Sequence, residues 1–219
     1  MSKKYKIDHI HISEKVYQTL KEMILKNELK SGEKLNQEKL SRMLGVSRTP
    51  ILSAFSKLEK EMLIEIIPRK GAYVKKLSKK EFVELYDIRL RLEPLGAYEA
   101  TKNAVDKEIG QLKAILDSFI SAVKQKASKL LSEKDYVFHM KIMEMSRNSL
   151  LYRIISSFNI IIISNIQGLL KEPEQSMEEH IALYNAIRDR KPELAERLMY
   201  EHILDSKNRI NQKILNDNK

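Results

Sequence analysis

The sequence predicts a mainly α-helical fold in two parts. The first, over residues 1–76, is a small helical domain that ends in a β-hairpin, and the second, over residues 77–219, is an antiparallel all-α helix bundle. Only 6 Gly and 5 Pro occur in 219 residues, which favours long helices over a strand-rich fold with many turns. Apolar β-branched runs occur near residues 63–75, and from residue 78 onward the apolar residues follow a helical period.

Three helices are predicted in the first part, over residues 13–27, 36–43 and 47–60. We expect Ser13 to cap the first helix, Gly45 to end the second and Ser47 to cap the third. A tight turn that contains Gly between two helices is typical of a helix-turn-helix.

A β-hairpin with a basic tip is predicted after these helices. Its strands cover residues 63–67 and 72–75, and residues 68–71 (PRKG) form the turn. This order of elements predicts a winged helix-turn-helix. Such a domain presents a helix to the major groove of DNA and a wing to the DNA backbone or the minor groove.

The second part begins with a predicted capping box, in which Ser78 is the N-cap and Glu81 is the third helical residue. One apolar face of the first long helix is marked by Phe82, Leu85, Ile88, Leu92 and Leu95. Further helices are predicted over residues 106–125, 127–146, 149–169, 174–189 and 192–216. Together these segments predict an antiparallel bundle of about six helices.

Positive charge is concentrated in the first third of the chain. Residues 1–80 contain 19 Lys and Arg against 9 Asp and Glu, a net charge of +10, whereas residues 81–219 contain 21 of each. A basic part suggests a polyanionic partner, which is nucleic acid or an acidic membrane surface. The absence of Cys excludes disulfides, thiolate zinc sites and cysteine nucleophiles, and favours a cytoplasmic protein. No apolar run reaches the ~20 residues of a membrane span and the N-terminus does not resemble a secretory signal, so we expect no membrane partner.

The helix-turn-helix and the hairpin resemble those of the GntR family of bacterial transcription regulators. The matching strings are LGVSRTP at residues 44–50, PRKGAYV at 68–74 and the GEKL turn at 32–35, within a region of about residues 13–76. The resemblance implies contact of Arg48 with a base edge or a phosphate of double-stranded DNA, and Arg suits bidentate contact with guanine. It also implies phosphate contacts from Ser47 and Thr49 at a helix N-terminus. The remaining implied DNA-binding residues are Lys39, Arg69, Lys70 and Gly71.

The recognition helix departs from the family at one position. Family members usually carry Arg where this chain has Leu52, so one guanidinium that contacts DNA is missing. The usual operator sequence therefore cannot be assumed for this protein, although DNA binding itself is still expected.

Polar residues inside the bundle are candidate ligands for a metal ion. Asp135 and His139 are four residues apart, which puts both on one helix face, and His180 and His202 lie beside apolar residues on two other helices. Three imidazoles and one carboxylate could converge in the bundle centre and would suit Zn, Ni or Mn with open coordination positions. The spacing leaves two alternatives open, which are a buried His satisfied by hydrogen bonding and an exposed Asp/His pair.

The bundle also resembles the FCD effector domain of FadR-type GntR regulators, over about residues 80–205. The matching strings are DIR at 87–89 with Glu93, DYVFH at 135–139, SRN at 146–148 and EH at 179–180 and 201–202. The resemblance implies a divalent metal ion held by Asp135, His139, His180 and His202.

The same resemblance implies a small organic acid effector. Arg89 would pair with the carboxylate of this acid while the metal holds its other oxygens, and an ion pair with Glu93 or Asp135 is the alternative role for Arg89. Asn148 is expected to cap or orient a helix. The polar side chains that interrupt an apolar stretch are expected either to line the pocket or to face solvent; these are Ser164, Asn165 and Gln167.

These observations predict a homodimeric transcription regulator. Two winged helices would read a short pseudo-palindromic operator, and the bundle would sense the organic acid through the metal. One alternative is a metal-dependent enzyme in which a His₃Asp metal activates water. Against it, the sequence has no obvious further Glu or His placed as a general base. Another alternative is a DNA-binding protein whose metal is purely structural.

Overall fold

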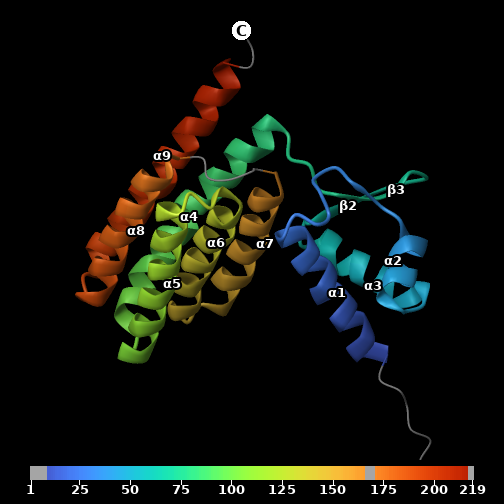
Figure 1. The fold of residues 1–219 in the computed structure, drawn as a ribbon, viewed down its shortest axis with the longest axis horizontal. Coiled ribbons are helices and arrows are strands. Elements are labelled where there is room, and N and C mark those ends of the chain that lie inside the picture. The colour runs from blue at the N-terminus through green and yellow to red at the C-terminus, as the bar shows by residue number, and fades with distance from the viewer. Residues whose placement is uncertain (1–8, 166–170, 217–219) are drawn as a thin grey trace, which may run out of the picture. The chain divides into compact units, whose positions relative to one another are not determined.

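A computed structural model describes residues 9–165 and 171–216 of the chain, and the side chains of residues 12–127, 130–158 and 171–210. The chain divides into two compact units, Met1–Lys76 and Leu77–Lys219 (Figure 1). The fold is mainly helical with one small antiparallel sheet in the first unit, as predicted.

Three helices form most of the first unit: α1 (His9–Leu25), α2 (Gln37–Leu44) and α3 (Arg48–Lys60). Helix α2 begins where the Asn36 side chain accepts a hydrogen bond from the Lys39 backbone N–H at 3.0 Å. It ends at Gly45, whose φ of 65° is the left-handed conformation that glycine adopts without a steric penalty. Helices α1 and α3 pack together, and the core between them and the sheet contains Leu20, Ile24, Ile51, Phe55, Leu58 and Val74.

The predicted start of the first helix is wrong. Helix α1 already includes His9, so Ser13 lies inside the helix instead of capping it. Serine costs a helix interior only about 0.5 kcal/mol relative to Ala, so a possible cap residue does not force a helix to begin. The helix ends at Leu25 rather than at residue 27, because Asn27 has a positive φ of 57°.

The small sheet contains β1 (Lys34–Leu35), β2 (Ile64–Ile67) and β3 (Gly71–Val74) in the order β1-β3-β2, and both pairings are antiparallel. The predicted hairpin of β2 and β3 is confirmed, with Ile64 opposite Val74 and Ile67 opposite Gly71. Strand β1 was expected to be part of a turn. A strand of two residues has no alternating pattern, and it forms here because it pairs with β3, nearly forty residues later in the chain.

Six helices form the second unit within the described residues: α4 (Lys79–Asn103), α5 (Asp106–Lys124), α6 (Ser128–Met145), α7 (Ser149–Asn165), α8 (Pro173–Arg188) and α9 (Pro192–Asn216). The predicted capping box of Ser78 and Glu81 is present at the start of α4. Helix α4 packs along α9 and also against α6 and α7, while α5 packs against α6 and α8. None of the helices in the described ranges is both long and apolar enough to cross a membrane.

The buried face of α4 differs from the predicted face. Ile88 is 43% exposed and Leu95 is 40% exposed, whereas Tyr86, Arg89 and Glu93 are buried. The spacing of apolar residues predicts the wrong buried face of α4, because Arg89 and Glu93 are buried as an ion pair.

Gly96 allows a close contact between helices. A Cβ atom at Gly96 would overlap the end of the fully buried Met143 side chain and would lie 3.1 Å from Leu151 Cδ2. Gly110 is a matched control because it lies on an exposed part of α5, and no atom of the described residues would be within 4 Å of a Cβ there.

We predict that Gly96→Ala lowers the free energy of unfolding by about 1–3 kcal/mol relative to Gly110→Ala, as the cost of overpacking. Both variants gain the same helix propensity, so their difference isolates the packing cost. Urea denaturation of the two variants measures it, and equal stabilities would contradict the prediction.

Candidate metal centre and DNA-binding surface

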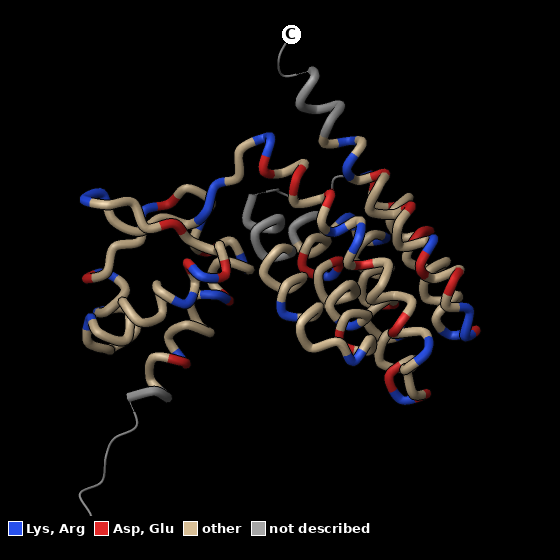
Figure 2. Tube along the Cα trace, turned by 180° about the vertical axis from the view of Figure 1, so that it is seen from behind, with Lys and Arg blue, Asp and Glu red and all other residues tan. Residues whose placement is uncertain are grey.

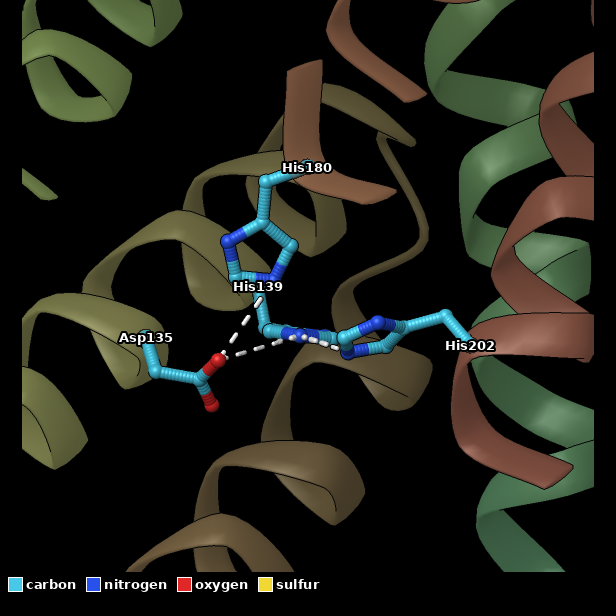
Figure 3. Close-up of side chains that lie close together, drawn as sticks. All are labelled: Asp135, His139, His180 and His202. Atoms are coloured by element: carbon cyan, nitrogen blue, oxygen red, sulfur yellow. Dashed lines mark hydrogen bonds and ion pairs between the residues drawn. The ribbon is translucent and has the colours of Figure 1, made fainter. Parts of the chain in front are cut away.

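Four side chains converge inside the bundle. Asp135 and His139 come from α6, His180 from α8 and His202 from α9, and one potential ligand atom from each lies within 4.8 Å of the others (Figure 3). The separation of Asp135 and His139 by one helical turn lets both side chains point the same way. The residues that the sequence analysis expected to converge therefore lie together.

Burial keeps two of the imidazoles neutral. His180 is fully buried and His202 is 6% exposed. Burial lowers the pKa of His180 well below its usual value, and the neighbouring His202, His139 and Lys171 lower it further. Burial, followed by the charges of His139, Lys171 and Arg89, lowers the pKa of His202 in the same way. Neutral imidazole is the form that binds a metal ion.

Two carboxylates orient the rings from behind. Glu93 Oε2 is 2.7 Å from His139 Nδ1, and Glu179 Oε2 is 2.6 Å from His202 Nδ1. Burial raises the pKa of Glu93, but the charges of Arg89 and His139 and the hydrogen bonds from both outweigh it and lower the pKa to about 2. Where a carboxylate accepts the Nδ1 proton of a neutral ring, Nε2 carries the lone pair that can bind a metal ion.

The Nε2 atoms of these two rings face each other. His139 Nε2 and His202 Nε2 are 3.2 Å apart in a buried site. When both rings are neutral and carry their protons on Nδ1, this contact is repulsive unless a cation or a proton lies between the nitrogens. A metal ion would convert the repulsion into two coordination bonds.

His180 supplies the third nitrogen and has no hydrogen bond of its own. Neither of its ring nitrogens has a hydrogen-bond partner among the described residues, although an unsatisfied buried polar group costs about 1–3 kcal/mol. His180 Nε2 lies 3.4 Å from Asp135 Oδ1, without hydrogen-bond geometry, and its ring stacks on Phe138 with centroids 4.3 Å apart. Asp135 is 27% exposed, and loss of solvation raises its pKa despite the opposing charges of His139 and Arg89.

The spacing of these donors suits one divalent ion. Two ligands about 2.1 Å from the same ion lie roughly 3.0–3.4 Å apart in octahedral or tetrahedral arrangements. Two observed separations fall in this range, which are 3.2 Å between the two Nε2 atoms above and 3.4 Å from Asp135 Oδ1 to His180 Nε2. Asp135 Oδ1 is farther, at 3.9 Å, from His139 Nε2. Three imidazoles with one carboxylate match the donor preferences of Zn, Ni and Mn.

Residues around the four donors were only partly visible in the sequence. In the sequence, Glu179 stands out only as the neighbour of His180. In the structure its carboxylate contacts the ring of His202 on another helix. Lys171 was not identified, although it is 5% exposed, pairs with Glu179 and lies 3.5 Å from Asp205 Oδ2. In the sequence, Lys171 is simply a charged residue between two predicted helices. That position does not show which helices its side chain contacts.

Arg89 forms an ion pair with Glu93, which is the alternative role that the sequence left open for it. Its Nε donates to Glu93 Oε1, its guanidinium lies 4.8 Å from the ring centroid of Tyr86, and it is 5% exposed. Glu93 therefore bridges Arg89 and His139 within the bundle.

Two other predictions concern residues near α7. Asn148 caps this helix, because its Oδ1 accepts a hydrogen bond from the Leu151 backbone N–H at 3.1 Å, as expected. The side chains of Ser164 and Asn165, and the whole of Gln167, lie outside the described part of the chain, so their expected positions stay predictions.

The residues expected to contact DNA lie on the surface of the first unit. Ser47, Arg48 and Thr49 are exposed at the start of α3, and Lys39 is exposed on α2. Arg69 and Lys70 are exposed at the tip of the hairpin, where Arg69 has a φ of 65°, and Gly71 begins β3. Arg48 forms an ion pair with Glu38 of α2, and both side chains are at least 60% exposed. Both signs of charge occur in each unit (Figure 2), and the excess of Lys and Arg over Asp and Glu lies within residues 1–80.

A basic winged helix-turn-helix followed by an all-α bundle with an enclosed polar cluster defines a two-part DNA-binding regulator. Residues 12–74 match the family of bacterial regulatory proteins named gntR, and residues 84–205 match the FCD domain. The chain belongs to the GntR family and carries an FCD domain.

Curated relatives agree with this assignment. The HTH-type transcriptional regulator YdhC of Bacillus subtilis is 28% identical over 191 residues, which cover 85% of each chain. The HTH-type transcriptional repressor RspR of Escherichia coli is 24% identical and covers 92% of this chain and 90% of its own. The gluconate operon transcriptional repressor of Bacillus licheniformis is 27% identical, with coverages of 87% and 82%.

A solved structure shows the same fold. Escherichia coli McbR/YncC aligns with a TM-score of 0.81 at 20% identity, over 93% of this chain and 98% of its own. The family and the relatives are transcription regulators, which confirms the prediction of a DNA-binding transcription regulator rather than an enzyme.

We predict that Glu179→Gln weakens Zn²⁺ binding by about 10–100-fold, because the neutral amide makes the His202 ring a poorer ligand. Competition with a chromophoric chelator measures the affinity. Glu178→Gln is the control, since Glu178 is the exposed neighbour of the same type, and it should bind Zn²⁺ like the wild type. Wild-type affinity in Glu179→Gln would contradict the orienting role.

Proposed function

We propose that this protein is a homodimeric, metal-dependent sensor of a small organic acid that controls transcription through its winged helix. The observation that carries the proposal is the buried His180, whose ring nitrogens have no hydrogen bond among the described residues and lie against three other potential ligands. A metal bound there would supply positive charge and open coordination positions for the oxygens of an acid. The ligands would be Asp135, His139, His180 and His202.

Arg89 would receive the carboxylate of the acid. A guanidinium can bind a carboxylate through two parallel hydrogen bonds, and Arg89 already donates one charge-assisted hydrogen bond, from Nε, to Glu93. An incoming carboxylate would therefore share or replace Glu93. Since Glu93 also orients His139, effector binding and the metal site would be coupled through one side chain.

The two units would divide the work. Residues 1–76 would bind DNA, with contacts from Lys39, Ser47, Arg48, Thr49, Arg69, Lys70 and Gly71, and residues 77–219 would bind the effector and form the dimer. Two winged helices in a dimer would read the halves of a pseudo-palindromic operator in successive major grooves. The protein would act in the cytoplasm, where its DNA target lies.

Effector binding can be tested by the melting temperature of the Zn²⁺-loaded protein with a panel of small mono- and dicarboxylic acids. We expect at least one acid to raise it, because a ligand at 100 times its Kd adds about 2.7 kcal/mol of stability. The control is the chelated protein with the same acids, in which the shift should largely disappear. A panel without any shift in the loaded protein would favour a purely structural metal.

DNA contact by Arg48 can be tested with an operator selected from random duplexes. If Arg48 makes a bidentate base contact, Arg48→Ala should weaken operator binding by about 1–3 kcal/mol while binding to unrelated DNA changes less. A phosphate contact would instead weaken both equally and reduce the salt dependence. The control is Arg197→Ala, because Arg197 is 67% exposed on α9. Gel shifts in which Arg48→Ala binds like wild type would remove Arg48 from the interface.

A further inference from the structure

The exposed face of α3 contains an apolar side chain. This helix buries Ile51, Phe55 and Leu58 against the core of the first unit, and it turns Arg48, Thr49 and Leu52 outward. Leu52 is 50% exposed and follows Arg48 by one helical turn, so the two side chains are neighbours on the same face.

The position of Leu52 gives its exposure a meaning. A single exposed leucine on a protein surface needs no explanation. Helix α3, however, is the second helix of the helix-turn-helix, and the first turns of such a helix contact base edges in the major groove. A side chain one turn after Arg48 is within the part of the helix that enters the groove. Its contacts there raise or lower the affinity for a particular base.

The chemistry of the major groove limits what a leucine can recognise. Base edges there present hydrogen-bond donors and acceptors, and the C5-methyl group of thymine is the apolar exception. Leucine placed against a polar edge would remove water without replacing its hydrogen bonds, which is unfavourable. Leucine placed against the thymine methyl buries apolar surface on both partners, and one such group is worth about fourfold in affinity.

We propose that Leu52 determines operator specificity by contacting the C5-methyl group of a thymine in the major groove. The proposal rests on the DNA-binding surface proposed above and names what one part of that surface reads. Arg48 would contact the neighbouring base or phosphate, so the two residues together would read adjacent positions of each half-site.

Thymine-to-deoxyuridine replacement tests this contact, because it removes the methyl group alone. In an operator selected by the wild-type protein, we expect at least one thymine whose replacement weakens wild-type binding about three- to fivefold per half-site. Leu52→Ala should bind the thymine and deoxyuridine operators equally. Leu150→Ala is the matched control, because Leu150 is 68% exposed in the other unit, and it should keep the full sensitivity to the methyl group.

A second variant gives a change of preference rather than a loss. Leu52→Arg should favour guanine over thymine at the sensitive position, since Arg binds the guanine O6 and N7 atoms. Two results would overturn the role of Leu52 while leaving DNA binding intact. In one, the wild type binds its operator with the same affinity after every thymine-to-deoxyuridine replacement. In the other, the replacement weakens binding by Leu52→Ala as much as binding by the wild type. Failure of the wild type to select any duplex would instead overturn the proposed DNA-binding surface and this inference with it.

Discussion

The Nε2 atoms of His139 and His202 lie 3.2 Å apart in the bundle interior, and a network of charged side chains surrounds this contact. Glu93 and Glu179 contact the Nδ1 atoms of the two rings, and a carboxylate that accepts the Nδ1 proton leaves Nε2 of a neutral ring able to bind a metal ion. Each carboxylate also pairs with a buried cation, Glu93 with Arg89 and Glu179 with Lys171. Since a buried ion pair is by itself weak evidence for stability, these pairs matter here as the surroundings of the imidazoles.

This chain of polar contacts connects helices that are distant in sequence. Helix α4 contributes Arg89 and Glu93, α6 contributes His139, α8 contributes Glu179 and α9 contributes His202. A cation at their meeting point would stabilise the packing of these helices against one another, because the donors it holds come from three of them. Binding at the centre and the arrangement of the bundle are thus parts of one equilibrium.

Local signals explain what the sequence predicted, and contacts between distant segments explain what it did not. Two correct predictions depend only on residues three or four apart in the chain. They are the capping box of Ser78 and Glu81 and the placement of Asp135 and His139 on one face of a helix. Strand β1 forms only by pairing with β3, and Glu179 meets His202 only after α8 packs on α9. The buried face of α4 was predicted wrongly for the same reason. Arg89 and Glu93 are buried against residues of other helices, and the period of apolar residues along α4 cannot identify those contacts.

The distribution of charge restricts how the bundle could act on DNA. The excess positive charge belongs to residues 1–80, whereas the charges around the imidazoles are compensated within the bundle. Salt also screens electrostatic fields beyond about 8 Å, so a signal carried by charge alone would not travel far. Helix α4 offers a mechanical route, because only four residues separate its start at Lys79 from the end of β3 at Val74, and it carries Arg89 and Glu93. An acid that bound one placement of α4 more tightly than another would act directly on the segment attached to the wing, which is the differential affinity that regulation requires.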